Sequence, residues 1–149
     1  MRSGKRMTYI ALPLFANLRK NLEEARANPN TAGVYQDIDT EADAVLAILK
    51  DLAPLADKME SYYSSKGYMA DDYAAATQMI AQYLPLYDAF VPAYDKFDAA
   101  VTTHFKEVQL ARLEDMRKEG RVNAAAFLEL NMKVRELADM LEQEQIDSA

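Results

Sequence analysis

The single histidine of the chain, His104, is the residue with the widest range of chemistry. An imidazole titrates near neutral pH, so it can act as a general acid, a general base or a metal ligand. It stands in helical register with Val101 and Val108, on a stripe of apolar residues, which favours a hydrogen-bonded residue in a core or on its flank. A di-metal helical bundle requires two Glu-x-x-His pairs, and the sequence contains none, so we expect no metal site at His104.

Paired carboxylates are the second chemical feature of the sequence. They occur at Asp39 and Asp43, at Glu23 and Glu24, and at Asp71 and Asp72. Two positioned carboxylates can perform acid–base catalysis, but the same residue types cap helices and solvate their outer faces. The sequence has no glycine-rich phosphate loop, nucleophile elbow or zinc-ligand spacing. We therefore expect the carboxylates to cap and solvate helices, and we expect no catalytic residue, cofactor or metal.

Tyrosine is the more informative residue type, with nine tyrosines and no tryptophan in the chain. The candidate ligand or partner surface comprises Tyr62, Tyr63, Tyr68, Tyr73, Tyr83 and Tyr87. A buried tyrosine packs a large ring and needs a partner for its hydroxyl. These rings therefore predict either core packing, with hydroxyls that reach the surface, or the lining of a cleft. Spacing alone leaves both interpretations open.

The element that must position most of these rings is a long helix from about Asp72 to Lys118. Apolar and aromatic residues recur every three or four residues from Tyr73 to Val108, which is the period of one helical face. Pro85 and Pro92 stand opposite that face, where they interrupt hydrogen bonds on the solvent side. We therefore expect one bent helix rather than two.

The flanks of this stripe change along the helix. Between Met79 and Val91 the stripe is widened on both sides by Met79, Leu86, Leu84 and Val91, which predicts at least two partner helices. Beyond Phe97 the flanks become polar, and Leu110, Leu113 and Met116 begin a stripe that is rotated from the first. This rotation predicts either a change of partner along one long helix or a break near residues 105–110. The inner zone is thus expected to hold the bundle and any pocket, and the outer zone to offer a surface for a partner.

Three further helices are expected around the long one. The first runs from about Gly4 to Ala27, with a stripe that includes Phe15, Leu22 and Ala25. The second starts between Gln36 and Thr40, with Asp37, Asp39 or Thr40 as cap, and ends at Gly67 in the left-handed conformation. The last follows Gly120, with Asn123 as cap, and its stripe is Phe127, Leu130, Val134, Leu137 and Leu141. The polar segment Gln143 to Ala149 is expected to fray.

Together these elements predict an all-α fold, an elongated antiparallel helical bundle of about four helices with one long, bent third helix. Residues 1–149 are expected to form a single domain. Met1 to Arg6 lacks the apolar core of a signal peptide, so the start is either natural or the boundary of a fragment that follows a removed export signal. The formal net charge of −7 disfavours nucleic-acid binding. The chain has no cysteine, so disulfides and thiolate chemistry are excluded.

One stretch carries a resemblance to a known family. Leu52-Ala53-Pro54-Leu55, followed by Tyr62-Tyr63-Ser64-Ser65-Lys66-Gly67-Tyr68-Met69-Ala70-Asp71-Asp72-Tyr73, resembles the YiiG-like bacterial lipoproteins of unknown function. The region from Lys5 to Asn21, with Tyr9-Ile10, is similar to that family's first helix. The resemblance implies a helical domain that is lipid-anchored at the periplasmic face of the cell envelope. The lipid-bearing cysteine would lie upstream, and a cytoplasmic location is the alternative.

The sequence therefore predicts a non-enzymatic helical domain of an envelope lipoprotein that acts as an interaction or ligand-binding module. Its partner would be an unknown protein or small molecule, and the membrane would be reached only through the upstream lipid anchor. The alternative is a structural, homo-oligomeric protein that pairs through a coiled-coil-like surface formed by residues 101–116 and Phe127 to Leu141. An enzyme that uses His104 or a carboxylate pair is the third class, and we do not expect it.

Overall fold

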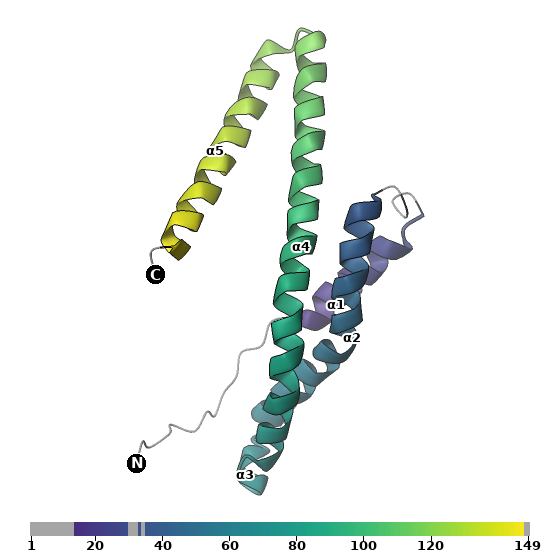
Figure 1. Ribbon diagram of the computed structural model, residues 1–149, viewed down its shortest axis with the longest axis vertical. Helices are drawn as coiled ribbons and strands as arrows, with labels where there is room; N and C mark the ends of the chain where they lie inside the picture. Colours follow the sequence, from purple (N-terminus) through teal and green to yellow (C-terminus); the bar gives the residue numbers. More distant parts are fainter. Residues whose placement is uncertain (1–13, 30–32, 34, 148–149) are drawn as a thin grey trace. The chain divides into compact units, whose positions relative to one another are not determined.

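The computed structural model describes residues 14–29, 33 and 35–147, and all of its regular structure is helical (Figure 1). The helices are α1 (Phe15–Ala27), α2 (Gln36–Ser64), α3 (Tyr68–Asp71), α4 (Ala74–Lys118) and α5 (Val122–Asp147). The chain divides into two compact units, Met1–Ala100 and Val101–Ala149. Helix α4 contributes residues 74–100 to the first unit and 101–118 to the second. The predicted all-α class and the long third major helix are confirmed, whereas a single domain over 1–149 stays a prediction.

The core of the first unit is built on α2. Val45, Leu49 and Leu52 are fully buried, and the same stripe continues through Ala56 and Met59. This confirms the predicted face of the helix, whose outer side carries the exposed Pro54. Phe15 from α1 and Phe90 from α4 join the same apolar cluster. Their rings meet edge to face, with centroids 5.1 Å apart, so α1, α2 and residues 74–100 of α4 share one core.

Arg26 fastens the end of α1 to the start of α2. Its Nη1 lies 2.7 Å from Asp39 Oδ1. Its Nε and Nη2 donate to the two carboxylate oxygens of Asp43, each at 2.8 Å. These hydrogen bonds lower the pKa of Asp43, because the ionised carboxylate is the better acceptor. One of the carboxylate pairs noted in the sequence is therefore a structural clamp between helices.

Several predicted helix boundaries need correction. The start of α1 between Gly4 and Pro13 lies outside the described residues, although its end at Ala27 is confirmed. Ala25 is exposed rather than part of the buried stripe. Helix α2 begins at Gln36 after Tyr35, with no side-chain cap. Asp39 does not cap α2; its carboxylate accepts from the backbone N–H of Gly33 at 2.9 Å and also binds Arg26.

Helix α4 is continuous from Ala74 to Lys118, with both prolines inside it. Pro85 and Pro92 are exposed, which confirms that they stand on its outer side. The expected double cover of the inner zone is wrong in part, because Leu84 and Val91 are exposed. Only the flank that contains Met79 and Leu86 is enclosed.

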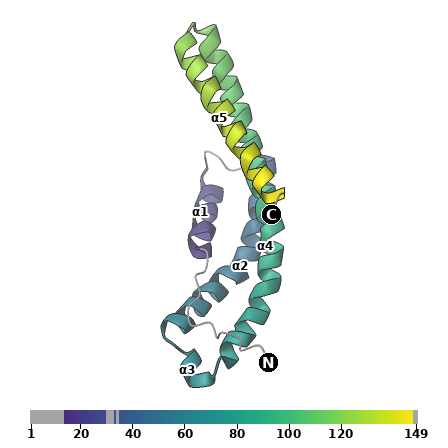
Figure 2. The same cartoon turned by 90° about the vertical axis from the view of Figure 1, so that its left-hand side faces the viewer.

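The second unit is a helical hairpin in which α5 runs antiparallel to the last part of α4 (Figure 2). Gly120 ends α4 with a φ of 73°, as expected for a left-handed stop. Helix α5 starts at Val122, so Asn123 is inside the helix and does not cap it. Gln143 also lies within this helix, which continues to Asp147. Arg117 Nη2 bridges the two helices near the turn, 2.7 Å from Glu129 Oε2.

Candidate functional site

Four of the six predicted tyrosines gather where α2 turns through α3 into α4. The rings of Tyr62 and Tyr63 meet edge to face with centroids 5.4 Å apart. Tyr63 then approaches Tyr68 at 6.1 Å, and Tyr68 stacks on Tyr73 at 5.1 Å. The rings contact one another in a continuous series, so each of the four rings packs against at least one other ring of the group.

Asp71 connects several groups of this segment, residues 62–75, which we call the tyrosine turn. Its Oδ1 accepts from the Tyr62 hydroxyl at 2.6 Å and from the backbone N–H of Tyr73 at 3.1 Å. Its Oδ2 accepts from the backbone N–H of Ala75 at 3.0 Å. Asp71 therefore caps the start of α4, which agrees with the capping role expected for the carboxylate pair Asp71 and Asp72. The hydrogen bond from Tyr62 is the main cause of a lowered pKa of Asp71, because it stabilises the ionised carboxylate.

The backbone of this turn differs from the prediction for Gly67. Lys66, not Gly67, adopts a left-handed conformation, with a φ of 58°. Gly67 has a φ of −51° and is required for space. A Cβ on Gly67 would lie 2.7 Å from Cδ2 of the Tyr62 ring, so a larger residue would displace the ring that binds Asp71.

Tyr62 provides a pH-dependent prediction. Burial, together with its hydrogen bond to Asp71, raises the pKa of Tyr62 to about 12, whereas an unfolded tyrosine ionises near 10. A raised folded pKa means that the contribution of Tyr62 to stability is present below about pH 10 and is lost as the pH rises through about 12. In Tyr62→Phe we expect a shallower alkaline loss of thermal stability, together with loss of the latest-titrating component of tyrosinate absorbance.

The matched control for that titration is Tyr35→Phe, at an exposed tyrosine outside this turn. It should leave the latest component unchanged. If the alkaline titration and the melting curves of Tyr62→Phe coincide with those of the wild type, the hydrogen bond to Asp71 does not govern the alkaline stability of this turn.

The remaining predicted tyrosines lie along α4 in the first unit. Tyr83 and Tyr87 stack with centroids 5.6 Å apart. Tyr87 continues to Phe90 at 6.4 Å, and Phe90 to Tyr94 at 5.5 Å. Tyr83 packs against the core cluster, whereas Tyr87 is partly exposed. The six predicted tyrosines thus do not form one surface. Four of them contact one another around α3, and Tyr83 and Tyr87 stack along α4.

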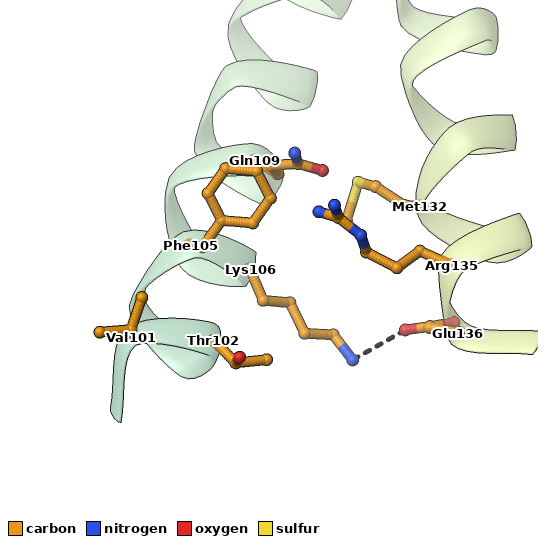
Figure 3. Close-up of a pocket in the computed structure, with 8 residues that line it drawn as sticks. All are labelled: Val101, Thr102, Phe105, Lys106, Gln109, Met132, Arg135 and Glu136. Carbon is orange, nitrogen blue, oxygen red and sulfur yellow. Dashed lines mark ion pairs between the residues drawn. The ribbon is translucent and has the colours of Figure 1, made fainter. Parts of the chain in front are cut away.

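A groove occurs in the second unit, between α4 and α5 (Figure 3). It has a volume of about 460 Å³. Its walls are Val101, Thr102, Phe105, Lys106 and Gln109 from α4, and Met132, Arg135 and Glu136 from α5. None of the six predicted tyrosines lines it. This groove could not be predicted directly from the sequence, because its lining depends on which side of α5 faces α4.

The charges of the groove are largely matched by groups inside it. Lys106 Nζ lies 2.7 Å from Glu136 Oε1, and this contact lowers the pKa of Glu136. The Arg135 guanidinium stands over the ring of Phe105, 5.4 Å from its centroid, in a cation–π arrangement. The lining could receive a small molecule with an apolar body and an acidic group, but Lys106 is already neutralised by Glu136.

The most exposed apolar surface of the second unit is on α5. We define the α5 face as Phe127, Leu130, Val134, Leu137 and Leu141, whose side chains are between 53% and 68% exposed. The sequence predicted this stripe as a helical face, and the exposed fractions show that the face is not buried within the second unit. The side of α5 that packs is formed instead by Ala125, with Ala124 and Leu128 beside it.

The two sides of α5 stand opposite each other. At 3.6 residues per turn, the centre of the α5 face lies about 180° around the helix from the side that carries Ala125, Leu128 and Met132. That second side contacts Leu113 and Met116 of α4 near the turn and lines the groove farther along. The hairpin contact is thus made by the stripe of small residues, and the larger apolar stripe is not covered within the described part of the second unit.

The other chemical candidates take part in contacts within their own helices. His104 is partly buried, and its Nδ1 lies 3.9 Å from Glu107 Oε2, which agrees with the expected place on the flank of the stripe. Glu23 pairs with Arg19 at 2.8 Å, and Glu24 with Lys20 at 3.8 Å. Among the residues that the structure describes, no group of three or more His, Cys, Asp or Glu residues could hold a metal ion.

No helix within the described ranges combines the length and apolar character needed to cross a membrane. Comparisons with curated proteins and with solved structures found no match to the chain. A family described as "Protein of unknown function (DUF3829)" matches residues 2–148. Since that match covers nearly the whole sequence, the chain belongs to the DUF3829 family.

Proposed function

We propose that this protein is a non-enzymatic interaction module whose contact surface is the α5 face. One observation carries the proposal: the five large apolar residues of the α5 face, which recur every three or four residues along the helix, are each more than half exposed. Soluble proteins rarely leave contiguous apolar patches of more than a few hundred Å² exposed unless the patch binds something. The regular spacing of three and four residues suits another helix as the binding element.

The groove offers an alternative surface, which would make the protein a ligand-binding module. We favour the α5 face because its area is apolar and uncovered, whereas the groove is crossed by the ion pair between Lys106 and Glu136. A ligand with an acidic group would have to compete with Glu136 for Lys106. Displacing such a pair costs free energy that the apolar part of the ligand must supply.

We also propose that the domain belongs to a cell-envelope lipoprotein and faces the periplasm. The support is the resemblance of the segment from Tyr62 to Tyr73 to the YiiG-like lipoproteins, in which the lipid-bearing cysteine lies upstream of the helical domain. A lipobox in the upstream gene sequence, together with recovery of the protein in the membrane fraction, is the expected result. Recovery as an untethered cytosolic protein would defeat this part of the proposal.

Photo-crosslinking in intact cells tests the contact surface. A photo-reactive amino acid is placed at position 137, in the centre of the α5 face, and in a control at position 50, where Lys50 is exposed on α2. We expect covalent adducts from position 137 and few or none from position 50, because only the first position should be within reach of a bound protein. If irradiation yields no adduct at position 137, the α5 face is not a contact surface.

A further inference from the structure

We propose that the α5 face binds the α5 face of a second copy of this chain. The inference rests on the proposed function and names its partner. The surface is a heptad seam, because Phe127, Leu130, Val134, Leu137 and Leu141 alternate at spacings of three and four. Side chains at these spacings interdigitate with those of an identical helix. A symmetric dimer needs one surface that is complementary to itself, and this seam meets that requirement.

The charge distribution on α5 favours a second copy. The whole chain carries a formal charge of −7, so two copies repel each other unless they meet through a neutral surface. Among the seam and its flanking positions Ala126, Asn131, Lys133, Ala138 and Met140, only Lys133 is charged. Glu129, Arg135 and Glu136 stand on the other side of the helix, toward α4. An identical acidic chain can therefore approach the α5 face without opposing carboxylates there.

The exposed area is close to what a stable dimer requires. Aromatic side chains present about 150–250 Å² each, leucine and valine present less, and the five residues of the α5 face are 53–68% exposed. Two copies would bury roughly 1,000 Å² through the seam alone, against about 1,200–2,000 Å² for stable interfaces. Met140, which is 63% exposed on the flank of the seam, adds to this area and brings it toward the lower end of that range.

The small core of the hairpin gives an independent reason for a second copy. The buried residues that the structure describes in the second unit form one cluster of Leu113, Met116 and Ala125, whereas α5 is 26 residues long. Helices in proteins draw most of their stability from tertiary packing, and this cluster supports only the end of α5 nearest the turn. Pairing along residues 127–141 would supply packing over the remainder of the helix.

Sedimentation velocity of the full chain over a range of about 1–200 µM tests the inference. We expect a dimer at the upper concentrations, and at least a 100-fold weaker association in Leu137→Glu because a buried carboxylate without a partner is strongly disfavoured. Leu137→Ala retains helix propensity and should weaken association about tenfold or more. The matched control is Leu84→Glu on α4, because Leu84 is 52% exposed and Leu137 is 57% exposed. The Leu84→Glu variant should associate like the wild type.

Circular dichroism confirms that each variant keeps its helix content, and Leu137→Ala remains informative if Leu137→Glu unfolds α5. The inference is overturned if the wild type is monomeric throughout the range, or if Leu137→Ala and Leu137→Glu associate as tightly as the wild type. If the chain is monomeric but position 137 forms adducts with a different protein, the inference of a dimer is wrong, while the proposed contact surface still holds. A monomeric chain without adducts overturns the proposed function as well.

Discussion

Replacing Phe90 with alanine is expected to lower the free energy of unfolding by about 3–5 kcal/mol, the range for buried aromatic truncations. Phe90 is 9% exposed and lies between Phe15 of α1 and Tyr94 of its own helix, with ring centroids 5.1 and 5.5 Å away. Its removal leaves a cavity in the core shared by α1, α2 and α4, and it also removes the edge-to-face contact with Phe15. Urea unfolding monitored by circular dichroism measures the loss.

Lys96→Ala is the control for Phe90→Ala, because Lys96 is exposed on the same helix. Surface substitutions of this kind usually change stability by less than about 0.5 kcal/mol. Equal losses in the two variants would show that the buried face of α4 has been assigned wrongly.

Leu113→Ala is expected to destabilise the second unit by about 2–4 kcal/mol, within the usual range for buried leucines. Leu113 is 5% exposed and forms the hairpin core with Met116 and Ala125. Because this cluster is so small, the loss should appear as local opening. Hydrogen exchange at low protein concentration should accelerate across α5 and stay unchanged across α2.

The control for Leu113→Ala is Leu110→Ala, at an exposed leucine of the same helix. It should leave exchange in α5 close to that of the wild type. If the two variants accelerate exchange in α5 equally, Leu113 does not hold the hairpin together. Acceleration that extends through α2 would mean that the two units do not open separately.

Much of the fold could be predicted from the sequence because the apolar period is regular. The α2 stripe through Val45, Leu49 and Leu52 is buried as expected, and Gly120 ends α4 as expected. Capping was less predictable, because short polar side chains serve several purposes. Asp39, a plausible cap, binds Arg26 and the Gly33 backbone, and only contacts between separate segments decide such a choice.

The candidate site was predicted less well, for a physical reason. A helical pattern identifies an apolar face but does not state what covers it. The α5 face reads the same in sequence whether it packs on α4 or on another molecule, and the hairpin contact was formed instead by Ala125 and Leu128. The predicted alternative of a homo-oligomer with a coiled-coil-like surface is the interpretation that the exposed α5 face favours.

The tyrosine turn shows a similar limit. The sequence predicted that Tyr62 and its neighbours either pack or line a cleft. The ring contacts and the hydrogen bond from Tyr62 to Asp71 support packing. The role of Gly67 was not visible in the sequence, since it depends on the position of the Tyr62 ring. These residues now have a structural explanation, while the partner surface is proposed for α5.

The most direct test of the α5 face uses the absence of cysteine from the chain. Lys133→Cys introduces a single thiol beside Val134, the middle residue of the α5 face. A spin label attached there in each copy lies close to the label of the other copy, whether the two α5 helices pair parallel or antiparallel. Pulsed dipolar spectroscopy should show a coupling between copies at roughly 15–30 Å, since packed helix axes are about 8–10 Å apart, and dilution with unlabelled protein should remove it. A label at Lys50→Cys is the control. Background decay alone at position 133, at concentrations where the dimer is expected, would contradict the account.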